Sequence, residues 1–382
     1  MQIGFQLGRE YKLSVAEILA VFPMGKTVFL SNDFLIIKGV EKENIIKKAD
    51  KLGGTIKIVE IINYDDILKD GLDNEGKFKY GISIFGEKRN LKKILLEQKK
   101  IFKAKGVSSR FINKDFKNLS SAQILGEKLL KSGGDYSIIY TNDNQFVGKT
   151  IWVQDIDNYS KRDWQKDRDM QIGMLPPKLC QIMINLSGGK NIYDPFVGLG
   201  TVLIESILMG NKNVYGSDLN TKMVENTINN INDFIKTNNL NLDDLKIIKL
   251  NSKFINESEI LLEKKVDSIV SEGYLGEVMT QKNINIERIN KQKISLLELY
   301  NKFFEGLKDI KYKGNLVICF PFWEIKGKKI FFEEIYNILN KYCIIENLFP
   351  NNYIITTTSS GSLLYKRTKQ LVGREIFKLK IK

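Results

Sequence analysis

Apolar and polar positions along the second part of the chain form blocks that favour strands and helices in turn. Short apolar runs bounded by Gly, Asn or Asp are typical of buried strands, and apolar residues three and four apart are typical of helices. From about residue 155 onward we expect strands at residues 191–193, 213–218, 246–250, 266–270, 314–320, 353–358, 363–365 and 374–379. Between them we expect helices at residues 179–186, 202–209, 223–235 and 296–307. This alternation predicts an α/β fold with a doubly wound, mostly parallel sheet.

The first 153 residues show a shorter α/β pattern that occurs twice. We expect strands at residues 3–7, 34–37, 56–62, 80–85 and 109–112, a hairpin at 136–140 and 145–153, and helices at 15–22, 43–52, 91–102 and 121–131. Ser14, with Glu17 three residues later, predicts an N-terminal cap for the helix at 15–22. We therefore predict three parts, an N-terminal α/β unit at 1–64, a second unit at 65–153 and a larger domain at 154–382.

Basic residues exceed acidic residues, 59 to 45, which gives a net charge of +14. Residues 86–131 are more basic still, with 13 Lys and Arg against 4 Asp and Glu. Such a surplus favours a polyanionic partner such as nucleic acid, and we expect a phosphate-binding surface to begin in this segment. The alternative is a lysine-rich composition with a solvated helix face.

The residue inventory excludes several kinds of chemistry. There is no histidine, so Ser-His triads, histidine metal ligands and imidazole acid–base catalysis are excluded. The three cysteines lie far apart in the sequence, which argues against a disulfide framework and a zinc site, and we expect no metal. No apolar run approaches the roughly 20 residues of a membrane span, and the first residues lack a signal peptide. We expect a soluble, cytoplasmic protein without a membrane partner.

A segment with two glycines follows the first strand of the larger domain. Its sequence at residues 194–201 is Asp-Pro-Phe-Val-Gly-Leu-Gly-Thr. Gly198 and Gly200 allow a sharp turn and a close approach of the backbone to a ligand, at the strand end where open α/β sheets bind ligands. No Gly-Lys-Ser or Gly-Lys-Thr follows, and Leu203 stands where a dinucleotide loop has its third glycine. The sequence therefore predicts a ligand loop that is neither a P-loop nor the usual dinucleotide loop.

Polar residues end the next two strands. Asp218 ends the second strand, where a carboxylate accepts hydrogen bonds from the two ribose hydroxyls of a nucleoside cofactor. The alternative for Asp218 is a helix N-cap. Asn251 follows the third strand, where a small polar side chain contacts adenine or forms an ordinary turn.

Residues 271–274, Ser-Glu-Gly-Tyr, follow the fourth strand. A target base is expected here, next to the bound cofactor. Tyr274 is a candidate to stack on that base, and Glu272 is a candidate to accept a hydrogen bond from an amine. The alternative is a plain turn with a surface glutamate.

Four segments, in the same order along the chain, resemble the THUMP-linked RNA guanine-N2 methyltransferases, specifically the tRNA guanosine-10 type. They are residues 7–17, residues 159–163 continuing to 176–179, residues 194–201, and residues 364–367 with 373–376. The resemblance implies a Rossmann-like methyltransferase domain preceded by a smaller α+β, ferredoxin-like or THUMP-like RNA-binding region. It implies S-adenosyl-L-methionine as the cofactor and tRNA as the substrate, methylated on the exocyclic N2 of guanine. It also implies a small activating protein subunit as a candidate partner.

The resemblance assigns roles to particular residues. With Asp218 and Asn251, which come from their positions at strand ends, the candidate cofactor-binding residues are Asp194, Phe196, Gly198, Gly200, Thr201, Asp218 and Asn251. The implied catalytic positions are Ser271, Glu272 and Tyr274.

The catalytic segment departs from the family's pattern. The family motif is Asp/Asn-Pro-Pro-Tyr/Phe, and at residues 271–274 this chain keeps the aromatic position but neither proline. Two alternatives therefore remain open. One is a DNA amino-methyltransferase acting on adenine N6 or cytosine N4, and the other is an inactive homologue that binds S-adenosyl-L-methionine and RNA.

Overall fold

The computed structural model describes the chain except residues 88, 157–158, 160–174 and 369. The charged segment at residues 160–174, part of the family resemblance, therefore lies outside the described residues. Residues cluster into an N-terminal unit, Met1–Val15 with Phe22–Trp164, and a C-terminal unit, Ala16–Val21 with Gln165–Lys382. Among the described residues, no helix is long and apolar enough to cross a membrane.

Eight strands of the first 153 residues form one sheet in the order β2-β3-β1-β4-β8-β7-β5-β6. They are β1 (Gln2–Leu7), β2 (Lys26–Leu30), β3 (Phe34–Lys38), β4 (Thr55–Ile62), β5 (Phe78–Phe85), β6 (Ser109–Phe111), β7 (Gly133–Tyr140) and β8 (Gln145–Val153). The helices are α1 (Tyr11–Val21), α2 (Lys42–Ala49), α3 (Asp66–Leu72), α4 (Leu91–Ala104), η1 (Lys114–Phe116), α5 (Ser121–Gly126) and α6 (Leu129–Ser132). Because β4 pairs with β8, the sheet is continuous across residue 64, and the predicted three-part division stays a prediction.

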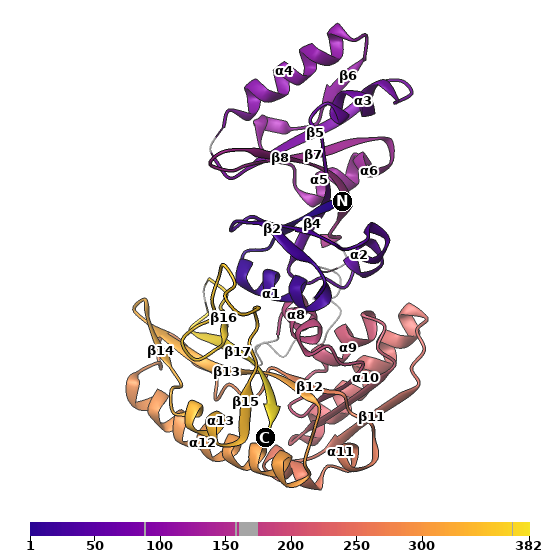
Figure 1. Ribbon diagram of the computed structural model, residues 1–382. Helices are drawn as coiled ribbons and strands as arrows, with labels where there is room; N and C mark the ends of the chain where they lie inside the picture. Colours follow the sequence, from indigo (N-terminus) through magenta and orange to yellow (C-terminus); the bar gives the residue numbers. More distant parts are fainter. Residues whose placement is uncertain (88, 157–158, 160–174, 369) are drawn as a thin grey trace. The chain divides into compact units, whose positions relative to one another are not determined.

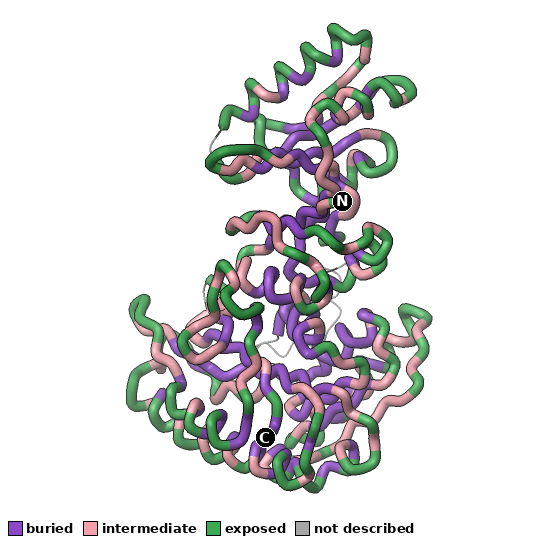
Figure 2. The backbone as a smooth tube through the Cα atoms, in the orientation of Figure 1, coloured by how far each residue is buried: buried purple, intermediate pink, exposed green. Residues whose placement is uncertain are grey.

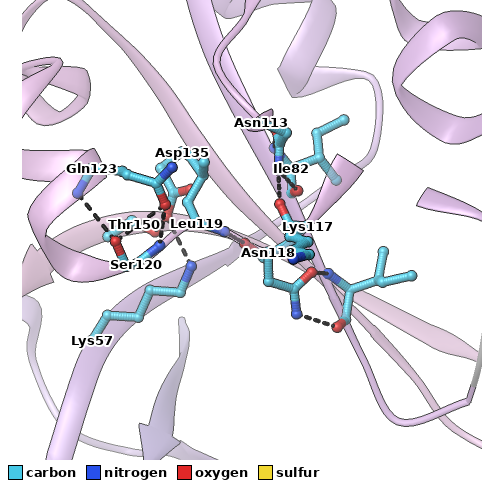
Figure 3. Close-up of polar contacts among 12 residues, drawn as sticks. Lys57, Ile82, Asn113, Lys117, Asn118, Leu119, Ser120, Gln123, Asp135 and Thr150 are labelled. Atoms are coloured by element: carbon cyan, nitrogen blue, oxygen red, sulfur yellow. Dashed lines mark hydrogen bonds and ion pairs between the residues drawn. The ribbon is translucent and has the colours of Figure 1, made fainter. Parts of the chain in front are cut away.

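Two asparagine side chains extend the pairing at the edge of this sheet (Figure 3). Asn113 accepts from the N–H of Ile82 at 3.1 Å and donates to its C=O at 2.7 Å. Asn118 does the same for Ile84, at 2.9 and 2.8 Å. Because β6 pairs with β5 only along residues 78–80, these two amides satisfy backbone groups of β5 beyond that point. They fix part of the basic segment 86–131 onto the sheet.

A buried ion pair lies inside the same sheet (Figure 3). Lys57 Nζ on β4 lies 2.8 Å from Asp135 Oδ2 on β7, and their side chains are 2% and 0% exposed. Thr150 Oγ1 on β8 donates to the same oxygen at 2.5 Å. A charge with so little solvent is tolerated only when it is paired and hydrogen-bonded, so the three strands depend on one another here.

The C-terminal unit contains a nine-stranded sheet whose main path is β11-β10-β9-β12-β13-β17-β15. The strands are β9 (Asn191–Asp194), β10 (Asn213–Asp218), β11 (Asp244–Lys249), β12 (Ser268–Ser271), β13 (Asn315–Ile325), β14 (Lys328–Phe331), β15 (Cys343–Ile345), β16 (Leu363–Tyr365) and β17 (Val372–Ile381). The first five strands of this path are parallel, and β17 runs antiparallel to β13. The chain runs outward from β9 to β11 and then returns to β12 on the other side of β9. A crevice for ligands is expected at this reversal, at the carboxyl ends of β9 and β12.

Helices cover both faces of this second sheet (Figure 1). They are α8 (Pro177–Ser187), α9 (Thr201–Leu208), α10 (Thr221–Asn238), η2 (Ser252–Glu257), α11 (Glu259–Glu263), α12 (Ile286–Asp309) and α13 (Ile335–Tyr342). Leu203 of α9 and Ile231 of α10 pack with strand residues of one face in one apolar cluster. Aromatic residues of α12, Phe303 and Phe304 among them, pack on the other face. Figure 2 shows buried residues along the strands and exposed residues on the outer sides of the helices. The parallel pairing of the first five strands, with helices on both faces, confirms the predicted doubly wound, mostly parallel sheet.

Three local predictions are wrong. The helix expected at residues 121–131 is interrupted at Lys128, whose φ of +57° separates α5 from α6. The first helix begins at Tyr11, so Ser14 lies inside it, where its hydroxyl accepts the N–H of Gly8 rather than capping the helix. Residues 353–358 form no strand. Instead, Thr358 N–H donates to Ser362 C=O, so the end of this segment is part of a turn rather than a ladder.

Candidate active site

Asp194 stands at the end of β9 and is 2% exposed. Its Oδ1 accepts hydrogen bonds from the N–H of Phe196 at 3.0 Å and from the hydroxyl of Ser271 at 2.6 Å. Burial raises the pKa of Asp194 to about 7, although these two hydrogen bonds oppose the rise. Asp194 therefore joins the glycine-containing loop to the loop after β12.

Gly198 is the position of the loop that is open to a ligand. It adopts φ of +53°, and a Cβ built there would meet no heavy atom closer than 4.0 Å. Its N–H donates to Asp218 Oδ2 at 3.0 Å. Gly200 differs, because its added Cβ would lie 2.9 Å from Thr227 of α10. Thr201, the first residue of α9, is buried, so Gly200 and Thr201 pack the loop onto the helices while Gly198 leaves space for a bound group.

Asp218 ends β10 as expected and remains partly exposed. Its Oδ1 accepts the N–H of Asn220 at 2.9 Å, and Asn220, not Asp218, is the N-cap of α10. Each carboxylate oxygen thus has one backbone donor and capacity for another. The neighbouring Leu219 is 63% exposed, and this apolar surface beside a carboxylate was missed in the sequence analysis.

Asn251 caps the short helix η2, because its side chain accepts the N–H of Lys253 at 3.1 Å. Asn251 therefore forms the turn that was the alternative expectation, and its contact with adenine stays a prediction. The next residue, Ser252, donates to the C=O of Pro195 at 2.7 Å and holds η2 against the glycine-containing loop.

The loop after β12, residues 271–274, has a backbone that a proline at 273 cannot adopt. Ser271 is fully buried, and its hydroxyl accepts the N–H of Gly273 at 3.0 Å besides donating to Asp194. Gly273 has φ of +69°, whereas proline fixes φ near −65° and lacks the N–H. Ser271 therefore holds the loop in place, and a direct catalytic role for it stays a prediction.

Tyr274 ends this loop and is 44% exposed. Its C=O accepts a hydrogen bond from the hydroxyl of Tyr300 on α12 at 2.9 Å. The Tyr300 ring lies 6.1 Å from the ring of Phe196, measured between centroids. Tyr300 was missed in the sequence analysis, because nothing in the helical pattern of α12 distinguishes it from a core residue. The hydroxyl of Tyr300 holds the backbone of Tyr274 in place, while the ring of Tyr274 stays exposed.

Glu272 is not a surface glutamate. Its side chain is 19% exposed and forms an ion pair with Arg374 of β17, whose side chain is 4% exposed. Burial raises the pKa of Glu272, and the charges of Arg374 and Arg367 oppose that rise. In the sequence analysis Arg374 was noted only as part of the closing segment, and no local signal pointed to its partner.

The site therefore combines three features at the carboxyl ends of neighbouring parallel strands. These are an open glycine loop after β9, a carboxylate at the end of β10, and an exposed aromatic ring beside a carboxylate after β12. Such an arrangement suits a nucleoside-type ligand next to a flat group that carries an amine.

Comparisons with known proteins address the same region. Residues 164–322 match a family model described as UPF0020, RMKL-like, methyltransferase domain. A tRNA (guanine(10)-N2)-dimethyltransferase of Methanothermobacter thermautotrophicus is 31% identical over 137 residues, which cover 35% of this chain and 37% of that protein. A protein of the same description from Methanocaldococcus jannaschii is 29% identical over 157 residues, which cover 40% of this chain and 43% of that protein. The chain spans less than half the length of these curated relatives, and over that length the matches confirm the family resemblance.

Solved structures resemble both units of the chain. The crystal structure of TrmN from Thermus thermophilus covers 100% of this chain and 99% of its own, with a TM-score of 0.50 and 14% sequence identity. This likeness confirms the α/β fold class. The assignment of the first 153 residues as THUMP-like stays a prediction.

Proposed function

We propose that this chain, whose residues 164–322 match a UPF0020 methyltransferase domain, is an S-adenosyl-L-methionine-dependent enzyme that methylates the exocyclic N2 of guanine in tRNA. The supporting observation is the hydrogen bond of 2.6 Å between Ser271 and Asp194. It joins the candidate cofactor loop after β9 to the candidate substrate loop after β12. The candidate donor and acceptor sites would therefore lie side by side. The proposed place of action is the cytoplasm, where tRNA is found.

The residues present fit the proposed cofactor. The open space at Gly198 would admit the methionyl part beside Asp194, and Asp218 would accept from the ribose hydroxyls. Leu219 and Asn251 would border the adenine. When bound, S-adenosyl-L-methionine supplies a methyl group activated by a positively charged sulfur.

The protein's own task in such a reaction is alignment. Methyl transfer to an amine is an in-line displacement, and holding two reactants in near-attack geometry removes a large part of the barrier. Glu272 would accept a hydrogen bond from the exocyclic amine and so direct the nitrogen lone pair toward the methyl group. The exposed ring of Tyr274 would stack on the flipped base. This mechanism needs no histidine.

The basic surface supports a nucleic-acid substrate. Residues 86–131 carry 13 Lys and Arg against 4 Asp and Glu, and Asn113 and Asn118 fix part of this segment onto β5. A fixed cationic surface binds a phosphate backbone without reading its sequence. The first 153 residues would serve as the THUMP-like RNA-binding region, and a small activating subunit is a candidate partner.

The test is incubation of the full chain with tritium-labelled S-adenosyl-L-methionine and either total tRNA or duplex DNA. The proposal expects label in tRNA, with N2-methylated guanosine in nucleoside mass spectrometry. Label in DNA would replace it with the amino-methyltransferase of DNA. No label on either polymer, together with cofactor binding by calorimetry, would replace it with an inactive binding protein.

A further inference from the structure

Arg374 is a buried cation whose side chain is 4% exposed, and neither the proposed cofactor site nor the proposed base-stacking residue accounts for it. It lies on β17 opposite Pro321 of β13, and three residues before Pro321, Ile318 pairs with Ser271 at the end of β12. Arg374 is therefore level with the loop that follows β12, at the edge of the sheet where the proposed donor and acceptor meet.

The guanidinium of Arg374 holds one oxygen of Glu272. Nε donates to Oε1 at 2.5 Å, and NH2 lies 2.5 Å from the same Oε1. A third nitrogen, NH1, donates to the side-chain oxygen of Gln370 at 3.1 Å, which fixes the plane of the guanidinium. Among the described residues, Oε2 of Glu272 accepts no hydrogen bond, although the side chain is only 19% exposed.

Stability alone does not explain this arrangement. A buried ion pair contributes little or nothing compared with apolar packing of the same volume, because both ions lose their hydration. Arginine and carboxylate groups also frequently pair through both oxygens, as a bidentate fork. Here two nitrogens of Arg374 contact Oε1 of Glu272, and Oε2 stays available. The site is partly buried, so a hydrogen bond from an external amine to Oε2 is stronger there than in water.

We propose that Arg374 is the positioning residue of this site, which holds Glu272 by Oε1 so that Oε2 accepts the hydrogen bond of the target amine. The proposal rests on the proposed methyltransferase function. Glu272 and Arg374 together take over the task that the family's first motif residue and proline turn perform. The acceptor is moved by one residue, from position 271, whose hydroxyl is engaged with Asp194, to position 272.

The charge on Glu272 depends on groups from several elements. Arg374 and the more distant Arg367 favour its ionised form, whereas burial disfavours it. Asp194 of β9, whose own pKa is raised to about 7, is the other acid coupled to it, and the un-ionised Cys319 and Tyr300 are packed nearby. Burial already raises the pKa of Glu272 in spite of these two arginines, so removal of Arg374 would raise the pKa further, and a protonated Glu272 is a weaker acceptor at Oε2.

The test compares Arg374→Met, Arg374→Lys, Glu272→Gln and the double variant Arg374→Met/Glu272→Gln. The rate of methyl transfer to tRNA is measured between about pH 6 and about pH 9, the range in which a buried carboxyl titrates. We expect Arg374→Met to lose about 100-fold in kcat at neutral pH, the scale of a misplaced catalytic group, and to recover as the pH rises. Arg374→Lys keeps the cation and should recover activity without the new pH dependence.

The glutamine variants separate Glu272 from Asp194. Glutamine cannot ionise, so the double variant should lose the pH-dependent recovery, while any pH dependence caused by Asp194 persists in all variants. Cofactor affinity by calorimetry and the thermal unfolding temperature should match the wild type in Arg374→Lys and Glu272→Gln, which also shows that these variants fold.

Two outcomes would overturn the inference, and they are distinguishable. If the wild type labels tRNA but Arg374→Met keeps its rate and pH profile, the positioning role is wrong and the proposed function stands. If the wild type transfers no methyl group to RNA, the proposed function fails and this inference fails with it.

Discussion

Replacing Gly273 with alanine perturbs the candidate substrate loop at its most constrained point. Gly273 has φ of +69°, and a Cβ there would lie 2.5 Å from the hydroxyl of Tyr300 and 2.9 Å from the C=O of Cys319. Neither distance is compatible with van der Waals contact, and the carbonyl belongs to the central strand β13. The loop must therefore move, and the hydrogen bond from Tyr300 to the C=O of Tyr274 is the contact that moves with it.

The expected cost follows from these two effects. A left-handed backbone costs a residue with a Cβ about 1–2 kcal/mol, and loss of one buried hydrogen bond costs about 1 kcal/mol more. We therefore expect Gly273→Ala to lower the free energy of unfolding of the C-terminal unit by about 2–3 kcal/mol. Because the loop carries Glu272 and Tyr274, a shift of about 1 Å should lower the methylation rate by about 100-fold.

Gly327→Ala is the matched control. Gly327 has a similar φ of +79°, but a Cβ there would meet nothing within 4 Å. The control should therefore lose only the backbone term, about 1–2 kcal/mol, and should keep the wild-type rate. Urea denaturation followed by circular dichroism gives the stability, and transfer of tritium to tRNA gives the rate. Equal losses of stability in the two variants, with both rates unchanged, would refute the constraint on the loop.

Three further perturbations test other parts of the molecule. Asp218→Ala removes the proposed ribose acceptor and the partner of the Gly198 N–H, so calorimetry should show about 10- to 100-fold weaker cofactor binding, and unchanged binding would contradict the assignment. The pKa of Asp194 is raised from 3.8 to about 7 by burial, so the folded protein holds a proton that the unfolded chain releases. Stability should therefore fall as the pH rises from about 4 to about 7, and an Asp194→Asn variant should lose this slope in thermal unfolding. Lys57→Met should destabilise the N-terminal unit by about 3–5 kcal/mol in urea, and adding Asp135→Leu should restore most of it; a double variant as unstable as the single would contradict the ion-pair argument.

The strand ends of the C-terminal unit could be predicted from the sequence because local signals define them. Each of the first four parallel strands is a short apolar run that ends in a polar or glycine-containing turn, as at Asp194 and Asp218. In a parallel sheet all such ends lie at one edge, so the candidate residues come together without any knowledge of the strand order. The grouping of Asp194, Asp218 and residues 271–274 follows from this rule.

The contacts that fix the loop after β12 could not be predicted, because their partners are distant in the sequence. Tyr300 and Arg374 lie 26 and 102 residues away from the groups that they bind. The strand prediction for residues 353–358 was wrong for the same reason. The β-branched residues of this segment favour a strand, but the nearby Ser360 and Ser362 donate hydrogen bonds to Glu375 of β17. Tertiary hydrogen bonds override local propensity in each case.

The loop after β12 is therefore held by contacts with other elements, whereas a proline motif would restrict its backbone directly. Two prolines restrict a turn through covalent bonds, whereas Gly273 widens the conformational range of the chain and makes the turn depend on its neighbours. Those neighbours come from separate elements, with Asp194 on β9, Tyr300 on α12 and Arg374 on β17. Of these contacts, the ion pair of Glu272 with Arg374 adds little stability, because the desolvation of both charges offsets most of their attraction. It lies next to Oε2 of Glu272, an acceptor that the loop leaves available, and this is the reason to interpret residues 271–274 as a rearranged substrate site rather than a lost one.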